Sequence, residues 1–201
     1  MTETSAGIDS SGALLARPMR AGNLPIKMVR ENLESIPEFA LPQNYSLRWY
    51  KAGDEAVWAR IQRRSDTLNQ IAAQLFEQQF GLDSALLAAR QGYLVNAEDA
   101  EIGTATAWFK NDFEGRNFGR VHWVAILPEY QGRGLAKPLM TAICRRLREL
   151  GHKGAYLSTS SARVKAIKLY LQFGFKPLIR SVEEEEAWRE LMSLSPVKRK
   201  S

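Results

Sequence analysis

Hydrophobic residues recur along this chain with two different periods. Val57, Trp58 and Ile61 begin a stretch in which apolar residues return every three or four positions, the spacing of a helix with one buried face. Asp54 is a candidate N-cap before this stretch, and Gly81 ends it. In chain order, helices are predicted over 54–80, 83–90, 134–150, 163–173 and 187–194.

Short apolar or alternating runs between these helices indicate strands. In chain order, they are predicted over 45–50, 93–96, 102–109, 120–127, 154–159 and 175–179. Pro128 ends the fourth of them, because proline cannot donate to a central ladder. The order of strand, helices, three strands, helix, strand, helix and strand predicts an α/β (mixed α+β) sheet with helices packed on it, in one domain.

Strict alternation divides the strand 120–127 between the two faces of the sheet. On one face it places His122, Val124 and Ile126, and on the other Val121, Trp123, Ala125 and Leu127.

These patterns divide the chain into four parts. Residues 1–22 are small and polar without an apolar period, which predicts a disordered or loosely attached arm. In 23–44 prolines break the apolar residues into short pieces, so this segment is predicted to lie on the domain surface. The domain itself is expected over 45–182, followed by a C-terminal helix and a basic tail over 183–201.

The composition of the 201 residues, 45% hydrophobic and 25% charged, is that of a globular chain. A single cysteine cannot form an internal disulfide, which excludes a disulfide scaffold and favours the reducing cytoplasm. No apolar run approaches the ~18 residues of a spanning helix, so no membrane partner is expected. The two histidines and one cysteine are too dispersed for a metal cluster, so no metal is expected.

The formal net charge of +6 is unevenly distributed along the chain. Residues 1–100 carry 10 Lys and Arg against 12 Asp and Glu, whereas residues 101–201 carry 18 against 10. The excess in the second half fits either a solvated basic face or an anionic partner, namely nucleic acid, a membrane surface or a phosphorylated cofactor. Composition alone does not choose among these.

The strongest local signal is a turn between the strand 120–127 and the helix that follows it. Gln131, Gly134 and Ala136 match the pattern [QR]-x-x-G-x-[GA]. Small residues there leave the amides of a helix N-terminus open to an anion, and Arg133 and Lys137 add positive charge. Taken alone, the turn is equally well explained by the backbone freedom of glycine. The P-loop pattern is absent, and a dinucleotide fingerprint would need a third glycine where Lys137 stands.

Three segments within about 120–178 resemble the GNAT superfamily of acyl-CoA-dependent N-acyltransferases: VAILPEYQGRGLAKPLM, AYLSTS and AIKLYLQFGF. The resemblance implies a single-domain fold with a central mixed sheet of six to seven strands flanked by helices. It also implies acetyl-CoA, or another acyl-CoA, as co-substrate. Residues 45–110 fit the family's order of elements without motifs, and 1–40 have no counterpart in its minimal fold.

The resemblance further implies a coenzyme site. The pantetheine arm would lie along Ala125, Ile126 and Leu127, where two strands splay apart and a bulge aims a backbone N–H at the thioester oxygen. The pyrophosphate would bind the loop formed by Gln131, Gly132, Arg133, Gly134, Leu135 and Ala136, with Lys137 nearby. The chain departs from the pattern at Arg163, where many members have an asparagine that reaches the coenzyme; Arg163 would instead meet a coenzyme phosphate or be solvated.

Two side chains take catalytic roles in this resemblance. Tyr170 falls where the family places its general acid, and a phenol with a pKa near ~10 is protonated at neutral pH, as donation to a leaving thiolate requires. Its alternative is a core tyrosine on an apolar helix face. His122 falls where related arylalkylamine N-acetyltransferases carry a histidine, and an imidazole suits proton removal from an ammonium, directly or through water. Its alternative is a hydrogen-bonded interior histidine.

The predicted function is therefore transfer of an acetyl group from acetyl-CoA to a primary amine by direct attack. The acceptor is a small-molecule amine or a protein amine, and a homodimer is one option for the assembly. A non-catalytic acyl-CoA-binding sensor or interaction module on the same fold is the alternative. A nucleic-acid binder is not expected, because the basic residues are not interleaved with a recognisable binding motif.

Overall fold

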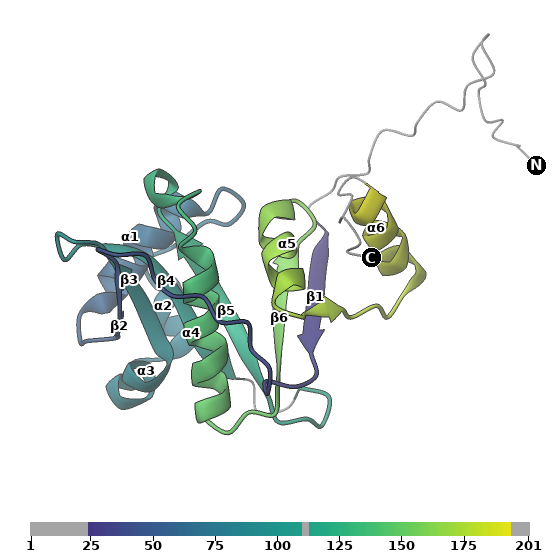
Figure 1. Cartoon of the computed structure of the whole chain (residues 1–201), viewed down its shortest axis with the longest axis horizontal. Coiled ribbons are helices and arrows are strands. Elements are labelled where there is room, and N and C mark those ends of the chain that lie inside the picture. The colour runs from purple at the N-terminus through teal and green to yellow at the C-terminus, as the bar shows by residue number, and fades with distance from the viewer. Residues whose placement is uncertain (1–23, 110–112, 194–201) are drawn as a thin grey trace, which may run out of the picture.

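The computed structural model describes residues 24–109 and 113–193, which form a seven-stranded sheet with helices on both faces (Figure 1). The strands are β1 (Pro25–Arg30), β2 (Ser46–Trp49), β3 (Gln91–Val95), β4 (Glu101–Phe109), β5 (Phe118–Ile126), β6 (Gly154–Ser160) and β7 (Lys176–Pro177). The helices are α1 (Asp54–Ser65), α2 (Leu75–Phe80), α3 (Ser84–Arg90), α4 (Ala136–Glu149), α5 (Val164–Gln172) and α6 (Val182–Ser193), with a 3-10 turn over Pro128–Tyr130.

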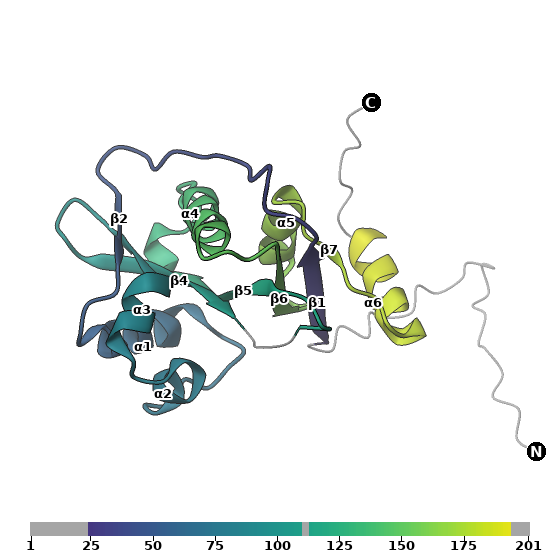
Figure 2. The same cartoon turned by 90° about the horizontal axis from the view of Figure 1, so that it is seen from below.

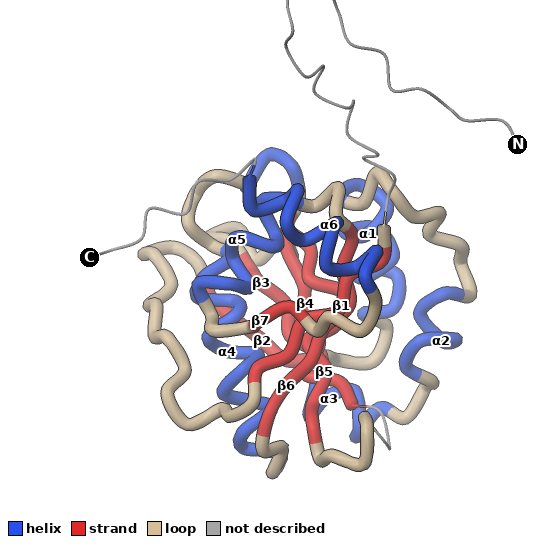
Figure 3. Tube along the Cα trace, turned by 90° about the vertical axis from the view of Figure 1, so that its right-hand side faces the viewer, coloured by secondary structure: helices blue, strands red, loops and turns tan. Residues whose placement is uncertain are grey.

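The sheet is mixed, as predicted. Its order is β2-β3-β4-β5-β6-β1-β7, in which only β5 and β6 run parallel and every other neighbouring pair is antiparallel. Helices α4 and α5 lie on one face, and α1, α2 and α3 on the other (Figure 2). Seen from the β1 end, the helices surround the strands (Figure 3). None of the helices in the described ranges is long and apolar enough to cross a membrane.

The prediction that 23–44 lies on the domain surface is wrong. Residues 25–30 form β1, which lies inside the sheet between β6 and β7, and its Met28 is fully buried. The prolines that break the later part of the segment do not interrupt these six residues. The chain after β1 then crosses α4, where the Thr141 hydroxyl donates to the Pro37 carbonyl at 2.8 Å. The arm predicted over 1–22 lies outside the described residues.

The helical region predicted over 54–80 is two helices separated by a turn. Helix α1 stops at Ser65, and the Asp66 side chain accepts hydrogen bonds from the backbone N–H groups of Leu68 and Asn69 at 2.8 and 3.2 Å. Such an aspartate turn offers the backbone an alternative to the helical ladder. The apolar period that continues through Leu68 therefore crosses a break that its spacing does not reveal.

Strands β5 and β6 pair over three positions only. The pairs join Phe118–Arg120 to Gly154–Tyr156, and beyond them the strands diverge (Figure 1). The backbone N–H and C=O groups on the facing edges therefore need other partners past Arg120 and Tyr156.

Strand β5 carries a bulge next to this divergence. Thr106 of β4 pairs with His122 and Thr104 pairs with Ala125, so a step of two residues in β4 lies opposite a step of three residues in β5. Trp123, inside the bulge, has φ of 49°, a left-handed conformation that is uncommon outside glycine. The strict alternation predicted for 120–127 is therefore wrong, because the extra residue places His122 on the same face as Ala125 and opposite to Ile126.

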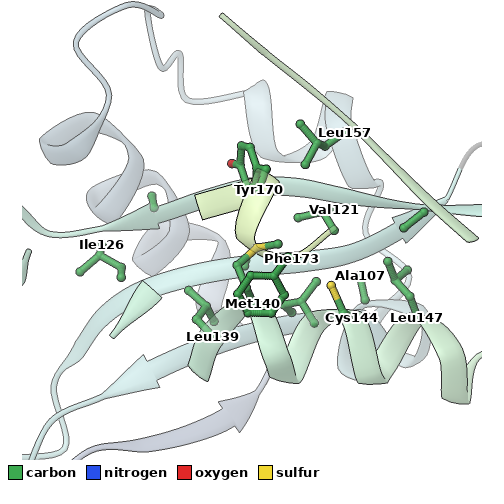
Figure 4. Packing of buried hydrophobic residues seen from close by; sticks show 14 of the residues in the cluster. Ala107, Val121, Ile126, Leu139, Met140, Cys144, Leu147, Leu157, Tyr170 and Phe173 are labelled. Carbon is green, nitrogen blue, oxygen red and sulfur yellow. The ribbon is translucent and has the colours of Figure 1, made fainter. Parts of the chain in front are cut away.

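One core layer lies between α4 and the sheet (Figure 4). Leu139, Met140 and Cys144 of α4 are fully buried beside Ala107 and Val121 of β4 and β5. Burial raises the pKa of the Cys144 thiol to about 12, so the thiol behaves as a small core residue and not as a nucleophile. This layer holds β5 in place beside the point where β5 and β6 diverge.

Candidate functional site

A cavity of about 900 Å³ opens where β5 and β6 diverge. Its walls are β5 from Arg120 to Ile126, the end of β6 from Ser158 to Ser160, and the first turns of α5 with Tyr170. The end of α1, the turn after it, Gln79 of α2, Gln131 and Pro25 also line it. The space is large enough for an extended ligand lying between the two strands.

The structure brings six of the sequence-predicted site residues to this cavity. They are His122, Ala125, Ile126, Gln131, Arg163 and Tyr170. Two others are occupied elsewhere: the Leu127 N–H donates to the Ile102 carbonyl at 2.8 Å, and the Leu135 side chain is buried in the core. Both leucine side chains are buried and support the fold, and the backbone N–H of Leu127 is already used inside the sheet.

The loop Gln131–Ala136 has the backbone form that its sequence pattern suggested. Gly132 and Gly134 have φ of 77° and 79°, and a side chain at either position would meet no atom within 4 Å. Glycine is needed there for its conformation and not for space. The Gln131 side chain donates to the Ile126 carbonyl at 2.9 Å, which fastens the loop to the end of β5.

The two positive side chains of this loop region point to aromatic partners. Arg133 lies over the Tyr130 ring at 4.9 Å and donates to the Tyr45 hydroxyl at 3.3 Å. The Lys137 ammonium lies 5.0 Å from the Phe39 ring. Neither side chain lines the cavity, so contact of either with a coenzyme phosphate would require it to change partners.

Tyr170 reaches the cavity from α5. It is 8% exposed, and no hydrogen bond to its hydroxyl is found within the described part of the chain. Burial raises the pKa of its phenol to about 12, with Arg163 opposing the shift. The phenol is therefore protonated at neutral pH and has a proton to donate.

A glutamine side chain contacts both His122 and its neighbour Trp123. The Gln79 amide oxygen lies 3.0 Å from His122 Nε2 and 3.1 Å from the Trp123 indole nitrogen. An indole N–H can only donate, so the atom between the two rings must be the oxygen, which then also accepts from Nε2. This network places the His122 proton on Nε2 and leaves Nδ1 as the nitrogen with a lone pair.

The surroundings of His122 keep its ring neutral. Burial lowers the pKa of His122 to about 2, and the positive charge of Arg120 lowers it further. The Phe80 ring packs edge-on at 5.6 Å, which contributes to the dry environment. The imidazole is therefore neutral with a free lone pair, and it can serve as a base only where a bound ligand raises this pKa towards the working pH.

The carbonyl groups on the open side of β5 are capped by residues that the sequence reading missed. Gln62 donates to the Trp123 carbonyl at 2.9 Å, and Ser65 donates to the Ile126 carbonyl at 3.1 Å. Gln62 is only 2% exposed, on the same helix face as Trp58 and Ile61. A glutamine in the apolar stripe of α1 was the available signal, because a buried amide needs a partner.

Arg163, the position that departs from the expected asparagine, is paired. Its Nη2 lies 2.7 and 2.8 Å from the two carboxylate oxygens of Asp66. Arg163 directly precedes α5 and Asp66 directly follows α1, so the ion pair joins two walls of the cavity.

The comparisons with known proteins agree with this geometry. The family model described as "Acetyltransferase (GNAT) family" matches residues 56–175, which covers the bulge, the glycine loop and Tyr170. The chain belongs to this GNAT acetyltransferase family.

Curated relatives of this GNAT protein include mycothiol acetyltransferases. The one from Pseudarthrobacter chlorophenolicus is 32% identical over 152 residues, covering 70% of this chain and 45% of the relative. The one from Sanguibacter keddieii is 28% identical over 179 residues, covering 82% of this chain and 54% of the relative. The chain thus spans about half the length of the curated relatives it matches.

Solved structures share the GNAT fold at low identity. A GCN5-related N-acetyltransferase from Sphaerobacter thermophilus superposes with a TM-score of 0.62 at 16% identity, covering 78% of this chain and 50% of that one. The ribosomal-protein-S18-alanine N-acetyltransferase from Escherichia coli gives 0.56 at 17% identity, covering 67% of this chain and 79% of that one. At such identities these likenesses concern the fold alone.

Proposed function

We propose that this GNAT protein transfers an acetyl group from acetyl-CoA to a primary amine by direct attack. The observation that carries the proposal is the cavity between β5 and β6, where His122 and Tyr170 line one space beside the bulge. Nothing in the lining suggests a covalent relay, since the one cysteine is buried under α4. A neutral base and a protonated acid are what direct acyl transfer to an amine needs.

The residues present fit acetyl-CoA. The open edge of β5 along Ala125 and Ile126 offers backbone groups to the pantetheine arm, and the left-handed glycines of the loop present amides to the pyrophosphate. Arg163 lines the same cavity. Bound there, the coenzyme supplies an activated thioester, and the backbone of the bulge supplies an N–H donor for the carbonyl oxygen as it gains charge.

His122 and Tyr170 then handle the protons. The amine nitrogen forms a bond to the thioester carbon while the carbon–sulfur bond breaks, so one proton leaves the nitrogen and one arrives at the sulfur. His122 Nδ1 takes the amine proton, directly or through water, because Nε2 is already protonated against Gln79. The Tyr170 hydroxyl gives its proton to the departing thiolate.

A thiol-release assay tests the proposal. Purified protein is mixed with acetyl-CoA and a panel of small primary amines and peptides, and free coenzyme A is measured with a chromogenic thiol reagent. Amine-dependent release with a stoichiometric acetylated product supports the proposal. Tight coenzyme binding with no release for any amine would favour the sensor or interaction module instead.

Four finer assignments belong to the same proposal. The acceptor is a small-molecule amine or a protein amine, and the relatives' name concerns those relatives only. A cytoplasmic location is tested by fractionation, and a homodimer by light scattering. The absence of metal is tested by an unchanged rate after treatment with a chelator.

A further inference from the structure

We propose that the amine acceptor carries an anionic group, such as a carboxylate, and that Arg120 binds this group inside the cavity. The inference rests on the proposed function and adds the charge of the substrate to it. It follows from one guanidinium next to His122 to which the described residues make no hydrogen bond or ion pair.

Arg120 lies two residues before His122 on the same face of β5, and it lines the cavity. Within the described part of the chain, no hydrogen bond or ion pair reaches its guanidinium, and its Nε atom is buried without a partner. Its nearest described partner is the Tyr156 ring, 5.9 Å from the guanidinium carbon. Burial lowers the pKa of Arg120, which shows how poorly the site solvates this charge.

The other arginine of the cavity shows the contrast. Arg163 is neutralised by Asp66 at 2.7 Å, and Asp66 is the only acidic side chain among the lining residues that the structure describes. Within residues 24–109 and 113–193, no carboxylate of the lining is therefore left for Arg120. A partly buried guanidinium without a counter-ion lowers the stability of the fold unless a ligand pairs with it. The planar donors of the guanidinium match the two oxygens of a carboxylate.

The phosphates of the coenzyme are too far away to be this ligand. Arg120 precedes the bulge, whereas the loop proposed to hold the pyrophosphate begins at Gln131, after the far end of β5. From Arg120 to Ile126 the strand alone extends about 20 Å, at ~3.3 Å per residue. A group bound at Arg120 is instead beside His122, the residue that would take the proton of the acceptor. We therefore assign the anion to the acceptor.

The first test is a binding measurement that needs no turnover. Unbranched ω-amino carboxylates of three to six carbons are titrated calorimetrically, each against the carboxamide of the same length. A charge-assisted hydrogen bond of about 1.5–3 kcal/mol predicts roughly 10- to 100-fold tighter binding of at least one acid. Equal or weaker binding of every acid would overturn the inference.

The second test uses variants. Arg120→Met should remove the preference for the acid, and Arg120→Lys should keep part of it, while Lys165→Met, an exposed lysine of the same lining, should leave it unchanged. If Arg120→Met does not fold, Arg120→Lys decides the question. Lysine lacks the planar pair of donors that matches a carboxylate, so an undiminished preference for the acid in this variant would refute the assignment. A preference that persists in a folded Arg120→Met protein refutes the assignment.

A third arm separates the two sources of an anion. The wild-type protein is offered succinyl-CoA and acetyl-CoA with one neutral amine. Faster transfer of the succinyl group, together with equal binding of acids and amides, would place the anion on the acyl group and overturn the assignment to the acceptor. Acid-selective binding without any acyl transfer would leave Arg120 as the anion site and contradict only the proposed function.

Discussion

The Asp66 carboxylate and the Arg163 guanidinium bridge two walls of the cavity, at 2.7 Å between the nearest atoms. Asp66 also accepts from two backbone N–H groups and from the Asn69 side chain, and these partners together hold its pKa below the usual value despite burial. The ion pair therefore links the end of α1 to the start of α5 and sets the charge that a coenzyme phosphate would meet there.

Asp66→Asn is expected to tighten coenzyme A binding. The amide keeps an oxygen for the turn that follows α1, but it removes one negative charge and releases Arg163 for a phosphate. We expect a roughly three- to tenfold lower Kd by calorimetry and a loss of about 1 kcal/mol in the free energy of unfolding. Glu129→Gln breaks the exposed pair with Arg64 and serves as control. A Kd that does not fall would mean that Arg163 stays away from the coenzyme.

Tyr170→Phe is expected to lower kcat by roughly 10²- to 10⁴-fold, the range of general acid catalysis. The free energy of unfolding should change little, because no hydrogen bond of the hydroxyl is found among the described residues. The measurement is thiol release at saturating acetyl-CoA. Tyr156→Phe removes another buried phenol that does not line the cavity, and its kcat should stay near that of wild type. Full turnover by the Tyr170 variant would remove the acid role.

Replacing Gln79 should change which nitrogen of His122 is protonated. Gln79→Met removes the oxygen that accepts from Nε2 and from the Trp123 indole, whereas Gln79→Glu keeps an acceptor there. The ring nitrogen shifts in ¹⁵N NMR report the tautomer, and the chain has only two histidines to assign. We expect Gln79→Met to mix the tautomers and to lower kcat more than it changes KM, and Gln79→Glu to restore protonation of Nε2. Gln78→Met, on the exposed side of α2, is the control. An unchanged NMR spectrum in Gln79→Met would contradict the network.

Acid should destabilise the protein through His122. Its pKa is near ~6.5 in the unfolded chain and about 2 in the folded one, so between these values only the unfolded state takes up the proton. The free energy of unfolding therefore falls as the pH falls, by about 2 kcal/mol between pH 7 and pH 5. Denaturant titrations at both pH values measure it.

The comparison with His122→Gln isolates this effect. The variant should lose most of the difference in unfolding free energy between the two pH values. His152→Gln, at the turn after α4, should keep most of it, because His152 is less buried. Equal pH dependence in wild type and His122→Gln would show that the imidazole is not held neutral by the fold.

The apolar periods were sufficient to predict several of the long elements. Helix α4 and strand β4 lie within two residues of their predicted bounds, because each buries one regular face. The glycine loop and Tyr170 could be proposed from the sequence because they lie in contiguous motifs. The family model confirms the family that those motifs suggested.

The parts that sequence reasoning missed depend on distant partners. Strand β1 is recognisable only beside β6, more than 120 residues later. The resemblance implied a bulge in this strand, but the alternation of 120–127 gave no sign that Trp123 would lie in it at positive φ. Gln79 contacts His122 across 43 residues, from a helix whose own pattern explains only its buried phenylalanines. Arg120 stands out because the described residues make no hydrogen bond or ion pair to its guanidinium, which the sequence does not show.

The place of β1 in the sheet also has a consequence for synthesis of the chain. Residues 25–30 leave the ribosome before both of their partners, β6 and β7, which lie after residue 153. At about 5–20 residues per second, β1 waits roughly 6–25 s for β6 with both edges open and its apolar face uncovered. The nascent chain thus carries an unpaired strand while the residues between β1 and β6 are made, and this half of the sheet closes only after β7 has followed.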